Sequence, residues 1–196
     1  METVTAVVGA AALVVTAVTV IPQTLRILRR GSTAGVSPVW AMLGVVSTGA
    51  WTAYTAARGL WWATVADALS CVSYLSSVHA LARHGESPRF TAGLAWLTVF
   101  VTAFLAAGLA GVGAVLAVAF VIQVAPSIWV AYRRTELQGA STATWFLTTS
   151  EGLLWLVYGL AEGDPAVIAF GVVATLAGTL MVGRIRWTSR LHPDSV

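Results

Sequence analysis

The chain of 196 residues is strongly apolar: 58% of its residues are hydrophobic, 10% are charged, and its mean hydropathy is +0.82. A soluble domain carries about 25% charged residues, so this composition excludes an ordinary soluble protein and predicts an integral membrane protein. The formal net charge is +3 and all eleven basic residues are arginine. Without lysine a retinal Schiff base cannot form, which excludes a microbial rhodopsin.

Hydropathy predicts seven membrane-spanning helices, each close to the length that crosses roughly 30 Å of hydrocarbon. In chain order they are residues 4–25, 38–57, 60–82, 91–108, 111–132, 143–161 and 165–184. The connections are short, and several contain glycine beside a charged residue. Glu2 precedes the first segment and no basic stretch does, so we expect a retained helix there instead of a cleaved signal peptide.

The distribution of arginine predicts the orientation. With seven spans, ten arginines fall on one side of the membrane: Arg26, Arg29, Arg30, Arg83, Arg89, Arg133, Arg134, Arg184, Arg186 and Arg190. Arg58 falls on the other side. Because basic loops stay in the cytoplasm, we expect a multi-pass protein of the cell (inner) membrane with its N-terminus outside and its C-terminus cytoplasmic. The arginine pairs are interpreted as topology signals and contacts to anionic lipids.

The chain also repeats itself at an offset of 104 residues. Residues 22–59 laid over 126–163 without a gap share ten of 38 positions. The shared residues are Pro22/Pro126, Arg29/Arg133, Arg30/Arg134, Gly35/Gly139, Ser37/Ser141, Leu43/Leu147, Trp51/Trp155, Tyr54/Tyr158, Ala57/Ala161 and Gly59/Gly163. Two copies of one unit predict a pseudo-symmetric site between them.

The repeat defines the expected architecture. We predict a first three-helix repeat over residues 1–86, a linker helix over 87–109, a second three-helix repeat over 110–187 and a cytoplasmic tail over 188–196. Because four helices separate equivalent positions, both repeats cross the membrane in the same direction. The fold class is therefore an all-α integral membrane protein, in which seven transmembrane helices form two parallel three-helix bundles joined by a linker helix (3+1+3).

Two prolines sit at equivalent places, Pro22 and Pro126, each shortly before an arginine pair. Proline removes a helical hydrogen bond and bends the helix. Their symmetric placement predicts hinges for a cytoplasmic gate. A static kink is the alternative, because proline is ordinary in membrane helices.

Two tryptophans, Trp51 and Trp155, lie about six residues inside the outer end of the second helix of each repeat, or roughly 9 Å deep at 1.5 Å per residue. That depth argues against an aromatic belt at the interface. We predict that they form walls of a solute-binding cavity. Packing against lipid or a neighbouring helix is the alternative.

Two acids, Asp67 and Glu151, lie inside predicted spans. An intramembrane carboxylate is unfavourable by a few kcal/mol and faces a cavity or a partner by default. At the 104-residue offset, Asp67 pairs with Gly171 and Glu151 pairs with Ser47. We predict that all four positions line one asymmetric pocket. The alternative for Asp67 is a protonated acid that forms a hydrogen bond to a neighbouring helix.

Nothing in the sequence indicates an enzyme, since Walker, GxSxG and HExxH motifs are absent. The single cysteine, Cys71, and the scattered histidines His79, His84 and His192 suggest neither a disulfide nor a metal site. We therefore expect no catalytic residue, no metal, no cofactor and no nucleic-acid partner.

The motifs resemble those of the SWEET, SemiSWEET and PQ-loop repeat transporter superfamily, in particular a bacterial member with two repeats and seven helices. The segments that carry the resemblance are Pro22-Gln23, GSTAGVSPVW (31–40), WTAY (51–54) and Asp67 in the first repeat, and Pro126, GAS (139–141) and WLVYG (155–159) in the second. The resemblance implies alternating access through a central cavity between the repeats. It nominates Trp51, Asp67, Trp155 and Gly171 for the site, with Pro22 and Pro126 as hinge elements. We also expect Tyr54 and Tyr158 to take part in the site.

The resemblance leaves three functions open. The first is transport of a small polar solute, with a sugar as the leading candidate. In this function the solute stacks on the tryptophans and forms a hydrogen bond to Asp67. Sugar-carrying members have asparagine at the positions of Asp67 and Gly171, so the second is a proton-coupled carrier of amino acids or cationic metabolites that uses Asp67 or Glu151. The third is a non-transporting receptor or assembly factor. The expected partners are the solute and the lipid bilayer, and a homo-oligomer is compatible with all three.

Overall fold

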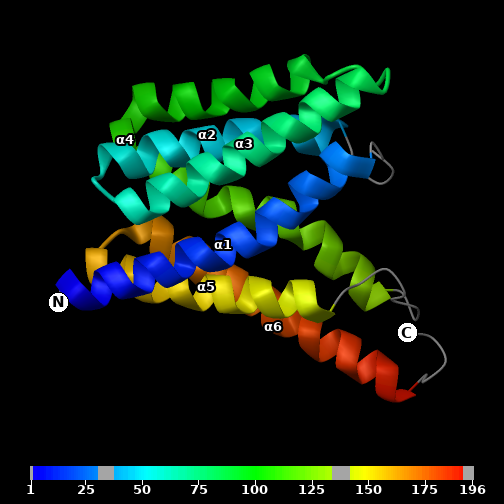
Figure 1. The fold of residues 1–196 in the computed structure, drawn as a ribbon. Coiled ribbons are helices and arrows are strands. Elements are labelled where there is room, and N and C mark those ends of the chain that lie inside the picture. Colours follow the sequence, from blue (N-terminus) through cyan, green and yellow to red (C-terminus); the bar gives the residue numbers. More distant parts are fainter. Residues whose placement is uncertain (1, 31–37, 134–141, 192–196) are drawn as a thin grey trace. The chain divides into compact units, whose positions relative to one another are not determined.

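A computed structural model describes residues 2–30, 38–133 and 142–191. The helices labelled in Figure 1 are α1 (Glu2–Arg30), α2 (Pro38–Ala57), α3 (Trp61–Arg83), α4 (Phe90–Arg133), α5 (Thr142–Glu162) and α6 (Pro165–Leu191). Every one of these elements is helical, and the described residues contain no strand. The prediction of an all-helical protein is therefore confirmed.

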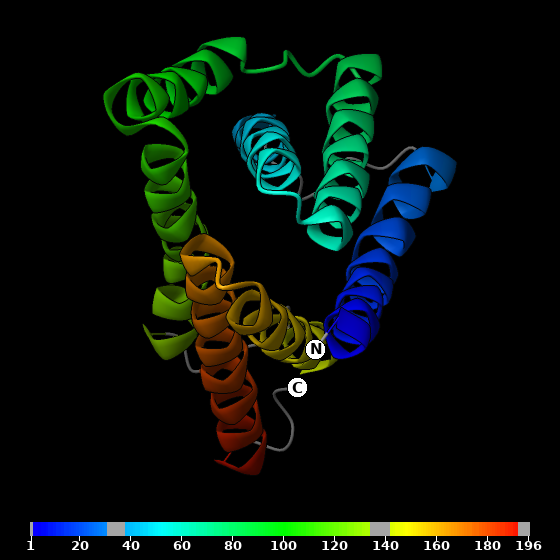
Figure 2. The same ribbon diagram turned by 90° about the vertical axis from the view of Figure 1, so that its left-hand side faces the viewer.

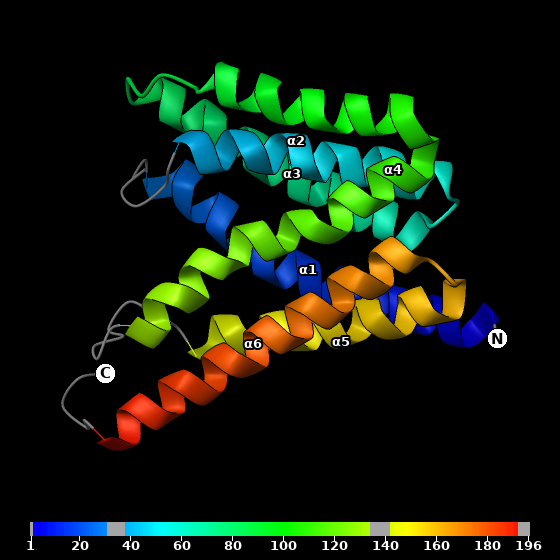
Figure 3. The same cartoon turned by 180° about the vertical axis from the view of Figure 1, so that it is seen from behind.

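Helix α4 is two helices joined by a sharp reversal. Ala107 and Gly108 leave the helical region, with φ/ψ values of −145°/17° and 61°/−143°. A positive φ is favourable for glycine because it has no Cβ, and the chain turns back on itself at this point (Figure 3). The two parts of α4 correspond to the predicted segments 91–108 and 111–132, so the described residues form seven helical segments.

Long apolar helices support the predicted multi-pass membrane protein. By length and composition, three stretches of the described chain could cross a bilayer: Trp61–Arg83, Pro165–Thr188 and Phe90–Ile122, the last of which contains the break at Ala107 and Gly108. Of these, Phe90–Ile122 is the most apolar. It has a mean hydropathy of 2.5 and exposes Leu94 (65%) and Leu105 (79%). Large apolar surfaces of this kind are unfavourable in water, whereas hydrocarbon chains solvate them.

The chain divides into two compact units, Gly9–Leu116 and Ala117–Val196 together with Met1–Val8. In the first unit α2 lies against α3 and against α4. Figure 2 shows α2, in cyan, beside α3. Gly44 of α2 leaves room for the ring of Tyr74 on α3, and Gly93 of α4 leaves room for Met42. Glycine at a contact leaves space into which a side chain of the neighbouring helix can pack.

In the second unit α5 and α6 contact each other through four glycines. A Cβ at Gly152 or Gly171 would lie 2.5 Å from a backbone nitrogen of the other helix, and one at Gly159 would lie 2.8 Å from such a nitrogen. Gly178 faces the backbone of α5 in the same way. The equivalent positions of the first repeat are Thr48, Thr55, Asp67 and Tyr74. The two repeats therefore build the same helix pair differently: side chains stand in the first where backbone meets backbone in the second.

Asp164 caps the N-terminus of helix α6, which begins at Pro165. It is completely buried, and its Oδ1 accepts hydrogen bonds from the backbone N–H groups of Ala166 and Val167, both at 3.1 Å. These donors would otherwise have no helical partner. Pro165 occupies the first helical position, where its missing N–H is harmless. Leu60, the equivalent residue before α3, forms no side-chain cap.

We expect the substitution Asp164→Ala to lower the free energy of unfolding by about 1–2 kcal/mol, because it removes an N-cap. The melting temperature of the purified protein in detergent measures this. Glu162→Ala removes an exposed acid two residues away and should change the melting temperature little. An equal loss in both variants would contradict a capping role.

Candidate functional site

The two repeats share one aromatic arrangement. Trp51 and Tyr54 meet edge to face, with ring centroids 6.1 Å apart and planes at 86°. Trp155 and Tyr158 repeat the arrangement at 5.5 Å and 85°. Each pair is three residues apart on a helix, so both rings lie on one face. The sequence repeat is thus also a repeat of side-chain geometry.

The two pairs differ in burial. Trp155 is 5% exposed and Tyr158 is 1% exposed, so the second pair is part of the packed interior of its unit. Trp51 is only half-buried, whereas its neighbour Tyr54 is 4% exposed and lies against Gly113 of α4. Of the two predicted walls, Trp51 is the more exposed one. Solute contact by either pair stays a prediction.

Asp67 lies on α3 beside a line of threonine hydroxyls. Thr55 Oγ1 of α2 is 3.5 Å from Asp67 Oδ2, and Thr64 Oγ1 of α3 is 3.1 Å from Thr55 Oγ1. Thr55 is completely buried and Asp67 is half-buried. A polar seam of Thr64, Thr55 and Asp67 therefore runs between α2 and α3. The carboxyl group has a partner on the neighbouring helix, as the alternative interpretation of Asp67 requires.

The hydrogens of this seam cannot satisfy every acceptor at once. Thr55 has one hydroxyl hydrogen, and the carbonyl oxygen of Trp51, at 2.8 Å, is its nearest acceptor. While that bond is made, Thr55 can only accept a hydrogen from Asp67, which needs the protonated acid. Thr55 can donate to an ionised Asp67 only when it turns its hydrogen away from the carbonyl oxygen of Trp51. The two acceptors therefore compete for one hydrogen.

Ser47 and Glu151 occupy equivalent positions but have different surroundings. Ser47 is 4% exposed, and its hydroxyl oxygen accepts a hydrogen bond of 2.8 Å from Trp96 Nε1 on the first part of α4. Ser47 thus ties α2 to the predicted linker helix. Glu151 is half-buried on α5, beside Gly152, which packs against Thr175 of α6. Their contact with a solute stays a prediction.

Gly171, the equivalent of Asp67, is buried at the contact between α5 and α6. A Cβ there would lie 2.5 Å from the backbone nitrogen of Leu156. The structure therefore gives Gly171 a packing role, and a role in solute binding stays a prediction. Pro22 lies in α1 and Pro126 in α4, but both side chains lie outside what the structure describes, as do residues 31–37 and 139–141 of the repeat motifs.

Sequence reasoning missed Thr55, Thr64 and Trp96. In an apolar segment, threonine usually bonds to the carbonyl one turn earlier on its own helix, so it gives no signal of a site. The repeat did contain a signal: Thr48 and Thr55 correspond to Gly152 and Gly159. Within the described part of the chain, no group of three or more His, Cys, Asp and Glu side chains could hold a metal ion.

Comparison with known families supports the resemblance in the first repeat. Residues 4–64 match the family model described as PQ loop repeat, a range that covers most of α1, all of α2 and the start of α3. No curated protein matches the chain. The PQ-loop family consists of membrane proteins of the transporter type and is not a family of enzymes. Residues 4–64 of this chain are therefore similar to a PQ loop repeat.

Proposed function

We propose that this protein transports a small polar solute, a sugar in first place, across the cell membrane by alternating access. The observation that supports this is the polar seam on α2 and α3. The seam contains the carboxyl group of Asp67 and the buried hydroxyl of Thr55, and the half-buried Trp51 lies one helical turn before Thr55 on α2. A small polar solute needs both an apolar face for its ring or chain and a few placed polar groups.

The architecture that we propose for this transporter is the 3+1+3 arrangement of seven spanning helices. Its N-terminus is outside and its C-terminus is in the cytoplasm of the inner membrane, as the arginine distribution predicts. The glycine contacts of α5 and α6 support a firmly packed second repeat, whereas the seam supports placing the specificity of the solute site in the first.

A second candidate, a proton-coupled carrier of amino acids or cationic metabolites, is favoured by the contact of Asp67 with Thr55. The described helices around the seam carry few other titratable groups: Tyr54 on α2, Arg58 just after it, and Cys71, Tyr74, His79 and Arg83 on α3. The described side chains of α1 and α4 in this unit, residues 9–19 and 90–116, include no titratable group. Asp67 is the carboxyl group of the seam and is the natural proton carrier in this version.

Uptake into proteoliposomes, with and without a pH gradient, separates the two candidates. If the protein is a facilitator, the rate of sugar uptake should not depend on the pH gradient. The Asp67→Asn variant should still take up sugar, because asparagine also forms hydrogen bonds. A coupled carrier should be accelerated by the gradient, and Asp67→Asn should remove that acceleration. Uptake of neither sugars nor amino acids above that of empty vesicles would refute the proposal.

The substitution Thr55→Val should lower the initial rate of uptake by about fivefold. It removes one hydrogen-bonding partner of Asp67, and such a bond contributes about 1 kcal/mol. Thr55→Ser should keep the rate. The matched control is Thr52→Val on the same helix, whose hydroxyl bonds to the carbonyl of Thr48 at 2.7 Å. Equal rates in the Thr55→Val and Thr52→Val variants would show that the seam plays no part in transport.

A further inference from the structure

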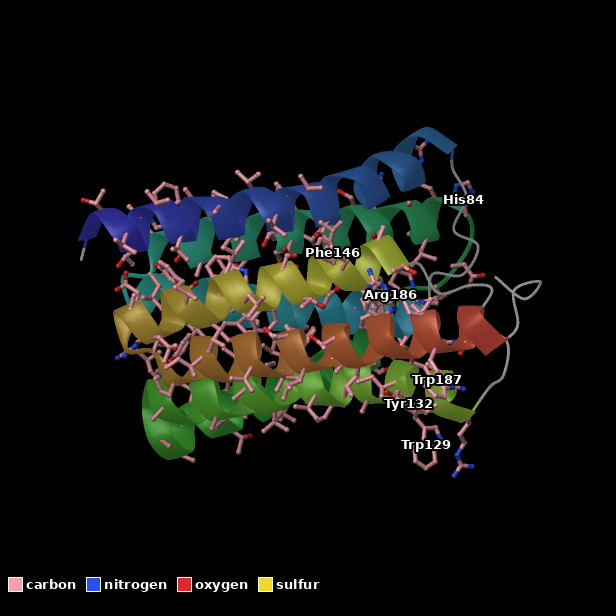
Figure 4. The ribbon with its side chains drawn as sticks, turned by 90° about the horizontal axis from the view of Figure 1, so that it is seen from below. His84, Trp129, Tyr132, Phe146, Arg186 and Trp187 are labelled. Carbon is pink, nitrogen blue, oxygen red and sulfur yellow. The ribbon has the colours of Figure 1, made fainter. Side chains whose placement is uncertain are left out.

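One end of α4 and the last turns of α6 carry a group of exposed aromatic rings and arginines. Trp129 is 61% exposed, Tyr132 51% and Trp187 60%. Figure 4 shows these three side chains at the same end of the helix pair. We call these three residues, together with Arg133 and Arg184, the arginine–aromatic cluster.

The helices that carry the arginine–aromatic cluster are packed against each other. Ala131, Met181 and Ile185 are each no more than 3% exposed and pack α4 against α6. Arg184 Nε donates a hydrogen bond of 3.0 Å to the carbonyl oxygen of Ala131. Because α4 ends at Arg133, this carbonyl is among the last four of the helix, which have no partner within it. Arg184 thus caps α4 and is held in place.

Both arginines of the cluster lie against aromatic rings. The guanidinium carbon of Arg133 is 4.0 Å from the ring centroid of Trp129, and that of Arg184 is 5.6 Å from the ring of Tyr132. A guanidinium stacked in this way is oriented, and its planar set of five donors matches the oxygens of a phosphate group. The two helices themselves contain no acidic residue.

The cluster is present in one repeat and not in the other. At the 104-residue offset, Trp129 and Tyr132 correspond to Leu25 and Leu28, and Arg184 corresponds to Ala80. Trp187 corresponds to Arg83, and of the two cluster arginines only Arg133 has a basic counterpart. The shared fold therefore does not require the cluster, and a general aromatic belt would be expected on both repeats. This points to a ligand bound by the second repeat.

We propose that the arginine–aromatic cluster binds the headgroup of an anionic phospholipid. The rings lie at the ends of apolar helices on the arginine-rich side of the chain, where tryptophan and tyrosine meet lipid headgroups. The positive charge of the two arginines favours an anionic headgroup over a zwitterionic one. In the zwitterionic headgroup, a positive group offsets the negative charge of the phosphate. The inference is independent of the solute that the protein transports.

Spin-labelled phospholipids incorporated into vesicles with the full-length protein test this, because lipid held by the protein gives a motionally restricted spectrum. Labelled phosphatidylglycerol should associate with the protein more strongly than labelled phosphatidylcholine. Arg133→Gln should reduce that preference by about fivefold, the effect of one arginine near an anionic surface. The double variant Arg133→Gln/Arg184→Gln should reduce it further.

Matched charge removal elsewhere is the control. Arg83→Gln/Arg89→Gln removes two exposed arginines from the same predicted side, and it should keep most of the preference. Arg133→Gln alone leaves the cap of Arg184 in place, and its melting temperature should match that of the wild type. The proposal is overturned if the control variant loses as much preference as the cluster variant. It is also overturned if inorganic phosphate in the buffer abolishes the preference, since the site would then bind a soluble anion.

Discussion

The substitution Trp51→Ala should lower the affinity for the transported solute by about thirtyfold, while the melting temperature stays close to that of the wild type. Truncating an aromatic anchor in a binding site is worth at least about 2 kcal/mol, which corresponds to this factor. Trp51 is half-buried, so its removal leaves a smaller defect in packing than a core tryptophan would. The concentration dependence of uptake into proteoliposomes measures the affinity.

The equivalent substitution Trp155→Ala should act mainly on stability. Its ring is 5% exposed and meets Tyr158, which is 1% exposed. Losing a buried tryptophan lowers the free energy of unfolding by about 3–5 kcal/mol. Trp61→Ala, at a 66% exposed position, controls for the loss of an aromatic ring from the surface. If Trp51→Ala and Trp155→Ala lost stability equally, Trp51 would be a packing residue and not a wall of the site.

Hydropathy predicted the helices well because a bilayer imposes their length and apolarity. The linker helix and its neighbour were expected as separate segments, and the break at Ala107 and Gly108 divides α4 between them. The far ends were missed: α1 continues to Arg30 and α6 to Leu191, beyond the predicted residues 25 and 184. Arginine lowers the hydropathy of a segment but has a high helix propensity. The apolar segment detected by hydropathy therefore ends before the helix ends.

The candidate site was predictable only in part. The repeat located both Trp–Tyr pairs, because a repeated backbone places equivalent side chains on equivalent faces. It could not show that Trp51 stays half-buried while Trp155 is enclosed, since burial depends on what packs around each unit. Gly171 illustrates the same limit. Its position equals that of Asp67, yet its surroundings are the backbone of α5.

Gly171→Ala should lower the free energy of unfolding by about 1–3 kcal/mol, the range for overpacking a close contact. A methyl group there would lie 2.5 Å from the backbone nitrogen of Leu156 and 2.6 Å from its Cα, and backbone atoms cannot turn away as a side chain can. The helices α5 and α6 would have to move apart. Thermal unfolding of the purified protein measures the change.

Gly183→Ala on the same helix provides a control with the opposite sign. Nothing lies within 4 Å of a Cβ at Gly183, so alanine should raise stability by about 0.5–1 kcal/mol through its better helix propensity. Two identical substitutions on one helix would then move the melting temperature in opposite directions. A gain at both positions would mean that α5 and α6 are not in close contact at Gly171. The second repeat would then lack the glycine packing that distinguishes it from the seam of Thr55 and Asp67 in the first.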